Sequence, residues 1–173
     1  MRIASLNERI NYSNKFAFNR NISMCGAETI LKKTPFFKKN DSKFLKAVKK
    51  SLTDYCSRIN YTWQHKKAFL DVERELCGKN SVSAFFHDTD KLFMYIIGIP
   101  QETAHNIHVR FAPHHVHNAH VKKPVMAVID WECARYTKAD KPLSARKFYE
   151  KFYVEEKNIR IPEIEEVLDK LGL

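Results

Sequence analysis

The hydrophobic pattern in the middle of the chain predicts β-structure. Segment 91–99 (KLFMYIIGI) is almost wholly apolar and is followed directly by a proline. Further along, Ile107, Val109 and Phe111 alternate with polar side chains. A period of two places apolar and polar residues on opposite faces of a strand. We therefore expect a strand at each of these two places.

Residues 124–136 form a third segment, which is apolar on both faces as far as Asp130. A run of this kind predicts a central strand with both faces covered. Because the connections between the three segments are short, an antiparallel meander is favoured over a parallel sheet, which would need a crossover helix at each step. A short alternating segment at 15–20 would add a fourth strand.

Helical periodicity lies on both sides of the predicted sheet. Apolar residues recur three and four positions apart, and capping residues stand at the expected ends. The predicted helices cover residues 42–59, 62–77 and 144–152, and a last one runs from Pro162 to Gly172. The predicted fold class is therefore α+β, with N-terminal helices, a three- to four-stranded antiparallel sheet and two C-terminal helices.

The length and composition suit a single domain. The chain has 173 residues, of which 44% are hydrophobic, enough for a substantial core. We expect an irregular basic arm at residues 1–34 and one α+β domain at residues 35–173. Positive charge is concentrated near the N-terminus: residues 1–67 contain 15 Lys/Arg and 4 Asp/Glu, whereas the remainder contains 15 and 16.

The basic residues of the predicted N-terminal helices indicate a surface for a polyanion. Few acidic residues accompany them, although a merely soluble helix usually intersperses both signs of charge. We predict non-catalytic binding of nucleic acid, DNA or RNA, through phosphate contacts. A solvated helix face and the docking of an acidic protein surface both stay open. The predicted contact residues are Lys38, Lys39, Lys43, Lys46, Lys49, Lys50, Lys66 and Lys67.

Histidines between the second and third predicted strands indicate a metal site. Four of the eight histidines fall within residues 114–120. Imidazole and thiolate groups are common ligands of Zn²⁺ and other divalent ions. The predicted ligands are His115, His117 and His120, joined by Cys133 from the next strand. Histidines exposed in a loop would give the same pattern. The sequence is therefore compatible with a bound divalent metal and with a protein that has no cofactor.

The same two strands would bring together residues suited to acid–base chemistry. The set consists of His108 and Arg110 on one strand and Asp130 and Glu132 on the next. Such groups can move protons and stabilise a developing phosphate charge. A small nuclease, metal-dependent or acid–base, is therefore the enzymatic alternative. A cross-strand salt bridge without chemistry fits the same residues.

Other catalytic motifs are incomplete. The tripeptide His87-Asp88-Thr89 supplies one His-x-Thr element, but a phosphoesterase site built on two such elements needs a second, which the sequence lacks. The four glycines are too scattered for a P-loop or a dinucleotide site.

Several features bear on the location of the protein. No run of 18 apolar residues occurs, so we expect no membrane span. The four cysteines are widely spaced, and we expect reduced thiols in an intracellular protein, cytoplasmic or nucleoid-associated. Residues 1–24 are basic and poor in acid, so an organelle presequence is a further alternative.

Overall fold

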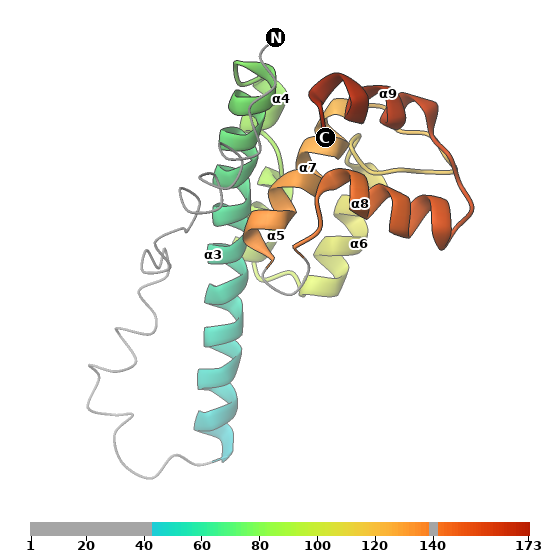
Figure 1. The fold of residues 1–173 in the computed structure, drawn as a ribbon. Helices are drawn as coiled ribbons and strands as arrows, with labels where there is room; N and C mark the ends of the chain where they lie inside the picture. The colour runs from blue at the N-terminus through green and yellow to red at the C-terminus, as the bar shows by residue number, and fades with distance from the viewer. Residues whose placement is uncertain (1–42, 139–141) are drawn as a thin grey trace.

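The structure, a computed structural model, describes residues 43–138 and 142–173, and these residues are mostly helical (Figure 1). They contain no β-strand, and the β-type pairing among them is one isolated bridge between His117 and His120. The predicted α+β class with its antiparallel sheet is therefore wrong. The elements are α3 (Lys43–Cys77), α4 (Val82–Phe85), α5 (Thr89–Ile96), α6 (Gln101–Phe111), α7 (Pro124–Thr137), α8 (Ala145–Tyr149), the π-helix η2 (Glu150–Glu155) and α9 (Pro162–Leu171).

Helix α7 takes the place of the predicted central strand. It packs against α3 on one side and against α8 and α9 on another, so it is buried around much of its circumference. A central helix and a central strand both need apolar residues on every face, and the two-sided pattern does not distinguish them. The 14 residues of α7 exceed the length of an ordinary strand, about 5–6 residues, and this length is the signal that favours a helix.

Helices α5 and α6 pack side by side where the other two strands were predicted. On α6 the buried residues are Ala104 and His108, which lie four positions apart on one face of the helix. Ile107 and Phe111 of the alternating pattern are exposed instead. The alternation of apolar and polar residues at 107–111 therefore does not predict which side chains are buried. The spacing of the α-helix determines this instead.

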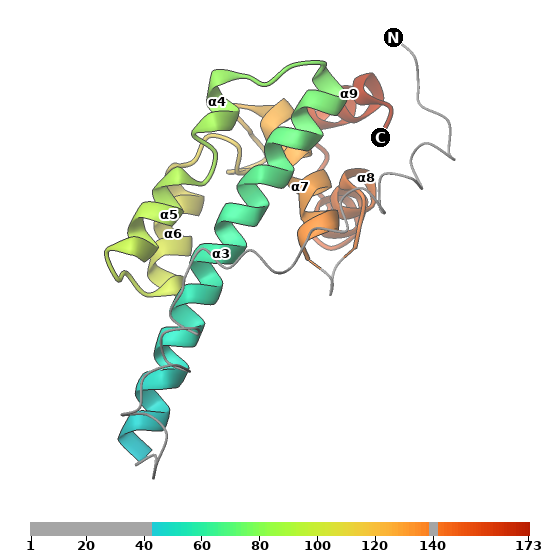
Figure 2. The same cartoon turned by 90° about the vertical axis from the view of Figure 1, so that its left-hand side faces the viewer.

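A single continuous helix, α3, replaces the two helices predicted at 42–59 and 62–77. Phe69 and Val72 in its C-terminal half share a core with Ile129 of α7. Helices α5 and α6 lie on one side of α3 and α7 lies on another, whereas no other described helix lies beside its first turns (Figure 1, Figure 2). The first turns of α3 thus stand clear of the other described helices, and the rest of the helix packs against them.

The C-terminal helices confirm the predicted capping. The Ser144 side chain accepts a hydrogen bond from the backbone N–H of Lys147 at the start of α8. Pro162 opens α9, and Gly172 ends it in the left-handed conformation, with φ of 68°. The hydroxyl of Tyr149 accepts a hydrogen bond of 2.7 Å from the buried N–H of Ile161, which ties α8 to the start of α9.

Other sequence expectations meet the structure only in part. The arm at residues 1–34 lies outside the described residues. Within the described ranges, no helix combines the length and the apolar character needed to cross a membrane. Cys77 and Cys133 are free thiols, but Cys56 is disulfide-bonded, which differs from the expectation that all cysteines are reduced.

Candidate metal centre

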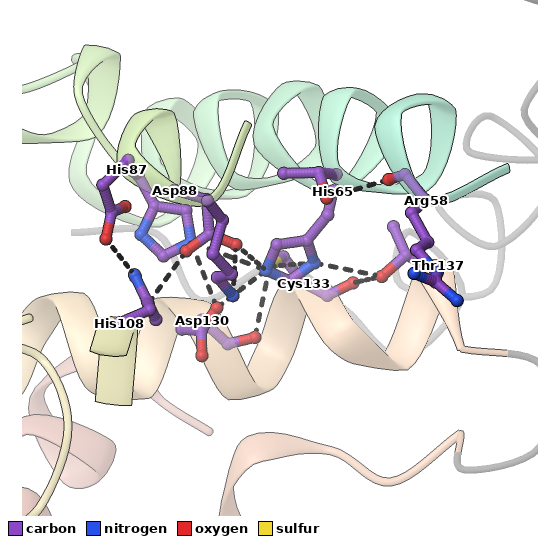
Figure 3. A network of polar contacts seen from close by, with 11 residues as sticks. Arg58, His65, His87, Asp88, His108, Asp130, Cys133 and Thr137 are labelled. Carbon is purple, nitrogen blue, oxygen red and sulfur yellow. Dashed lines mark hydrogen bonds and ion pairs between the residues drawn. The ribbon is translucent and has the colours of Figure 1, made fainter. Parts of the chain in front are cut away.

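Histidine and aspartate side chains from separate parts of the chain meet where α3, α5, α6 and α7 come together (Figure 3). They come from α3, from the turn before α5, from α6, from the loop after α6 and from α7. Most are buried, although 65 positions separate the first from the last. The members, which we call the histidine–aspartate centre, are His65, His87, Asp88, His108, His114, His115 and Asp130.

Local structure explains how three of these side chains reach the centre. His65 lies one turn before Phe69 on the buried face of α3, so the periodicity of the helix directs it inward. The ring of His87 stacks on Phe69 with centroids 3.9 Å apart. Asp88 has a φ of 55°, in the left-handed region that is uncommon outside glycine, and it begins α5. Backbone strain of this kind concentrates at functional sites.

Three donor atoms form the tightest group in the centre. Nε2 of His65 lies 2.8 Å from Oδ1 of Asp130, and Nε2 of His87 lies 3.2 Å from the same oxygen. The two imidazole nitrogens are 3.5 Å apart. Ligands bound tetrahedrally at about 2.0–2.1 Å from Zn²⁺ are about 3.3 Å from one another. The three atoms therefore have the spacing of ligands that share one cation.

The two ring nitrogens of His65 contact different partners. Nε2 lies 2.8 Å from Oδ1 of Asp130, and Nδ1 lies 3.2 Å from the Thr137 oxygen, whose hydroxyl can donate to the carbonyl oxygen of Cys133 at 3.3 Å. With its proton on Nε2, His65 donates a hydrogen bond to Asp130. With its proton on Nδ1 and Thr137 as the acceptor, Nε2 offers a lone pair, and a cation between Nε2 and the carboxylate oxygen would bind both.

A second group of donors lies beside the first. Nitrogens of His108, His114 and His115 lie within 4.8 Å of one another. The Nε2 atom of each is buried and has no hydrogen-bond partner among the described residues. Buried polar atoms are rarely left without a partner. Three convergent imidazoles are a donor set suited to a further cation, although Nε2 of His108 also lies 3.1 Å from Oδ1 of Asp88.

Asp88 lies between the two groups. Its Oδ1 is 3.1 Å from Nε2 of His108 and 3.7 Å from Nε2 of His87, and its Oδ2 is 2.8 Å from Nζ of Lys91. Oδ1 makes no hydrogen bond within the described part of the chain, although it is buried. A carboxylate in this position can contact a cation in either group.

The charges of the centre favour the forms of these side chains that bind metal. Burial alone would raise the pKa of Asp88, but the charges of His87 and Lys91 lower it to about 2. Burial opposes ionisation of Asp130 as well, and hydrogen bonds from His65 and His87 hold its pKa well below the usual range. Both carboxylates are therefore ionised at neutral pH.

Burial has the opposite consequence for the two loop histidines. It lowers the pKa of His114 to about 3 and that of His115 to about 4, because the charged form loses its hydration. Both rings are thus neutral at physiological pH. A neutral imidazole is the form that offers a lone pair to a metal.

The centre opens into a cavity of about 1020 Å³. His65, Asp88, His115 and Asp130 of the centre line it. The other charged side chains on its wall are the cations Arg58, Lys91 and Lys138 and the single anion Asp54, and aromatic rings form much of the remainder: Tyr61, Tyr95, Trp131, Phe148 and Tyr153.

No protein-family model, curated protein or solved structure matches the chain.

The residues predicted for acid–base chemistry separate into three places. His108 and Asp130 belong to the centre, but they come from helices and not from paired strands. Arg110 is exposed, with its guanidinium over the ring of Phe111. Glu132 is buried elsewhere: its carboxylate accepts a hydrogen bond of 2.8 Å from the N–H of Ala145 and pairs with Arg135. Glu132 therefore fixes the start of α8.

The residues predicted as metal ligands also separate. His115 belongs to the second donor group, and Cys133 lies near His65 and Asp130. His117 and His120 are exposed and pair with each other through backbone hydrogen bonds of 2.8 and 2.9 Å. Among the described residues neither belongs to a group of potential ligands.

The predicted nucleic-acid contacts follow α3 for most of its length. Lys38 and Lys39 lie outside the described residues, and Lys43 and Lys49 belong to α3. Lys46 and Lys50 are exposed in the first turns of α3. Lys66 is engaged within the fold, where it donates to the carbonyl oxygen of Phe85 and to Thr89, and Lys67 lies over the ring of Trp63.

Sequence reasoning did not identify His65, His87 or Asp88 as members of a site. His65 continues the apolar stripe of Phe69 and Val72 at helical spacing. A histidine on an apolar stripe was the available signal. The adjacent pair His87-Asp88 lies outside the predicted helices and strands, and only the tertiary structure brings it to the other histidines.

Proposed function

We propose that the protein is a metal-dependent hydrolase of phosphate esters, with the histidine–aspartate centre as its active site. The observation that carries the proposal is the convergence of donor atoms on Oδ1 of Asp130, which lies 2.8 Å from Nε2 of His65 and 3.2 Å from Nε2 of His87, two nitrogens that are 3.5 Å apart. Donor atoms at this spacing can share one cation.

The donor types indicate the class of metal. Imidazole nitrogens and carboxylate oxygens suit Zn²⁺, Mn²⁺, Fe²⁺ or Co²⁺, whereas Mg²⁺ prefers oxygen ligands and keeps several waters. The first cation would be held by His65, His87 and Asp130. The second would be held by His108, His114 and His115, with Asp88 between the two. Pairs of cations about 3.5–4 Å apart are common in phosphoester hydrolysis.

The wall of the cavity supports a phosphate substrate. Bound cations would neutralise the carboxylates of Asp88 and Asp130, which leaves Arg58, Lys91 and Lys138 as an excess of positive charge over Asp54. Lys91 is placed nearest the centre, because its Nζ lies 2.8 Å from Asp88. These side chains would bind and orient phosphoryl oxygens and stabilise charge on them as the ester bond breaks.

The reaction would be a hydrolysis. A bound divalent cation lowers the pKa of a water molecule enough for it to act as a nucleophile near neutral pH. A bond forms from the water oxygen to phosphorus, the ester P–O bond breaks, and a proton passes to the leaving oxygen. The aromatic side chains on the cavity wall would exclude bulk water and contact the organic part of the ester.

Nucleic-acid binding is a second proposed function, and the exposed lysines in the first turns of α3 favour it. Lys46 and Lys50 are exposed there, and the net charge of residues 1–67 is strongly positive. Phosphate contacts of this type give affinity that falls steeply with salt and carries little sequence information. An acidic protein surface could occupy the same helix, and it would bind with similar sensitivity to salt.

The proposed hydrolase is tested with tag-free protein. The metal content is measured by mass spectrometry, and the hydrolysis of bis(p-nitrophenyl) phosphate and p-nitrophenyl phosphate is followed with Mn²⁺, Zn²⁺, Co²⁺ or a chelator. We expect bound metal and chelator-sensitive hydrolysis in the wild type. His65→Gln and Asp130→Asn should lose both, whereas the control His120→Gln should keep both. Hydrolysis that survives chelation and both substitutions would contradict the proposal.

Binding is tested separately with labelled single- and double-stranded DNA and RNA at about 0.15 M salt, near physiological ionic strength. Lys46→Glu together with Lys50→Glu should abolish a shift of intact probe, and retained affinity would contradict a role for α3. The pair Glu163→Lys and Glu166→Lys on α9 alters charge elsewhere and serves as the control. Cleavage of the probe would instead make nucleic acid the substrate of the centre.

A further inference from the structure

Asp130 and Cys133 share one face of α7. They are three positions apart, a spacing that places side chains next to each other on a helix surface. Both lie toward His65 of α3, which crosses beside them (Figure 3). The same helix therefore presents a carboxylate and a thiol to the same imidazole.

The thiol of Cys133 is fully buried and close to the first donor group. Its Sγ lies 3.6 Å from Nδ1 and 3.7 Å from Nε2 of His65, and it donates to the carbonyl oxygen of Asp130 at 3.2 Å. Ligand atoms of Cys133, His65 and Asp130 all lie within 4.8 Å of one another. Oδ1 of Asp88, which is buried and makes no hydrogen bond among the described residues, lies 3.7 Å from Nε2 of His87 across the same centre and is a further potential oxygen ligand.

We infer that Cys133 is a thiolate ligand of the cation held by His65 and Asp130, and that it makes this subsite selective for thiophilic ions such as Zn²⁺ and Co²⁺. The inference rests on the metal centre of the proposed function and names the class of its metal. A site built only from imidazole and carboxylate ligands also binds Mn²⁺, and the ion that it holds depends on which metals are available. A thiolate ligand favours softer ions.

Ligation exchanges one interaction of the thiol for another. The side chain turns about its Cα–Cβ bond, gives up its hydrogen bond to the Asp130 carbonyl and loses its proton to solvent as the sulfur binds the cation. A cysteine thiol ordinarily keeps its proton at neutral pH, and a metal binds it as the thiolate. Binding of the cation therefore releases a proton that a subsite without Cys133 would not release.

The second free cysteine provides a matched control. Cys77 ends α3 and is half-buried, and no group of potential ligands among the described residues includes it. Cys77→Ser and Cys133→Ser each remove one thiol and leave a hydroxyl of similar size. Only the second substitution removes a donor from the centre.

The test is a Co²⁺ titration of chelator-treated full-length protein, followed by absorption spectroscopy. A sulfur-to-cobalt charge-transfer band in the near ultraviolet should accompany the visible cobalt bands in the wild type and in Cys77→Ser. Cys133→Ser should keep the visible bands, lose the ultraviolet band and release one proton fewer for each cation bound. Its affinity for Zn²⁺ should fall by roughly tenfold or more, while its affinity for Mn²⁺ should change less.

The outcomes separate the inference from the proposed function. Visible cobalt bands that depend on His65 but lack the ultraviolet component in the wild type would overturn ligation by Cys133 and leave the metal centre in place. An ultraviolet band that persists in a folded Cys133→Ser would also overturn it. A wild-type protein that binds no cation at all would overturn both, and circular dichroism shows whether each variant is folded.

Discussion

Nε2 of His65 on α3 lies 2.8 Å from Oδ1 of Asp130 on α7, although 65 positions separate the two residues. The two helices bring this pair together by burying Phe69 and Ile129 next to it. An apolar core thus positions an imidazole and a carboxylate that can form a hydrogen bond or share a cation. The contact is the part of the structure from which the proposed chemistry follows.

Thr137 is predicted to hold His65 in the form that binds metal. Its oxygen lies 3.2 Å from Nδ1 of His65, and by accepting a proton from that nitrogen it would leave Nε2 with a lone pair for a cation. Thr137→Val has nearly the same shape but removes the acceptor, and the affinity for Zn²⁺ should fall about 10–100-fold. Isothermal titration calorimetry against a competing chelator measures this. Thr137→Ser keeps the hydroxyl and should bind like the wild type; equal losses in both variants would point to packing instead.

Asp90 is predicted to orient His108. Its Oδ2 lies 2.7 Å from Nδ1 of His108, whose other nitrogen faces Asp88 and the second donor group. Asp90→Ala should weaken binding of the second cation about 10–100-fold and leave the first nearly unchanged. Titration with metal followed by mass spectrometry under native conditions would show one tightly held ion where the wild type holds two. Loss of both ions at once would contradict separate subsites.

The folding stability of the metal-free protein should fall as the pH is lowered from about 6.5 toward 4. The unfolded chain takes up protons on His114 and His115 at the ordinary pKa of 6.5, whereas the folded protein takes them up only near 3 and 4. The unfolded state therefore binds more protons in this interval, and the free energy of unfolding rises with pH. Chemical denaturation at several pH values measures the slope.

A double variant isolates the contribution of these two histidines. His114→Gln with His115→Gln removes both titrating groups, and the slope between pH 6.5 and 4 should become shallower. Asp88 and Asp130 have lowered pKa values, so their contribution is present above the ordinary carboxyl pKa of 3.8 and is lost below it. An unchanged slope in the double variant would contradict the burial of the two imidazoles.

Glu132 is predicted to matter for stability and not for chemistry. Its carboxylate accepts the N–H of Ala145 at 2.8 Å and pairs with Arg135, so its removal leaves a buried donor without a partner. Glu132→Ala should lower the free energy of unfolding by about 1–3 kcal/mol. Metal content and hydrolysis at a temperature where the variant is folded should match the wild type. A variant that is folded but inactive would contradict a purely structural role for Glu132.

The C-terminal half of the fold was more predictable than the middle because its signals are local. Ser144, Pro162 and Gly172 determine helix ends through their own backbone and side-chain preferences, and each acts where the sequence indicated. The two-sided apolar run of α7 carries no such local signal, since burial on all faces suits both a central helix and a central strand. Its length was the observation that distinguished the two.

The candidate centre was predictable only in its chemistry. His108, His115, Asp130 and Cys133 were chosen because their side chains bind metals or move protons, and the structure brings these four into one region. Their neighbours His65 and His87 could not be predicted as partners, because the contact between them depends on the packing of α3 against α7 and α5. His117 and His120 had equally suitable side chains but lie on the surface.

The donor groups come from α3, from the turn before α5, from α6 with its following loop and from α7. A cation held by such ligands would cross-link segments that also adhere through apolar clusters, such as the one built on Met94, Tyr95 and Ala104, and through hydrogen bonds from Lys66. Metal present at 1,000 times its dissociation constant adds about 4 kcal/mol to the free energy of unfolding. The availability of metal in the surroundings would therefore affect the resistance of the protein to proteolysis as well as its proposed activity.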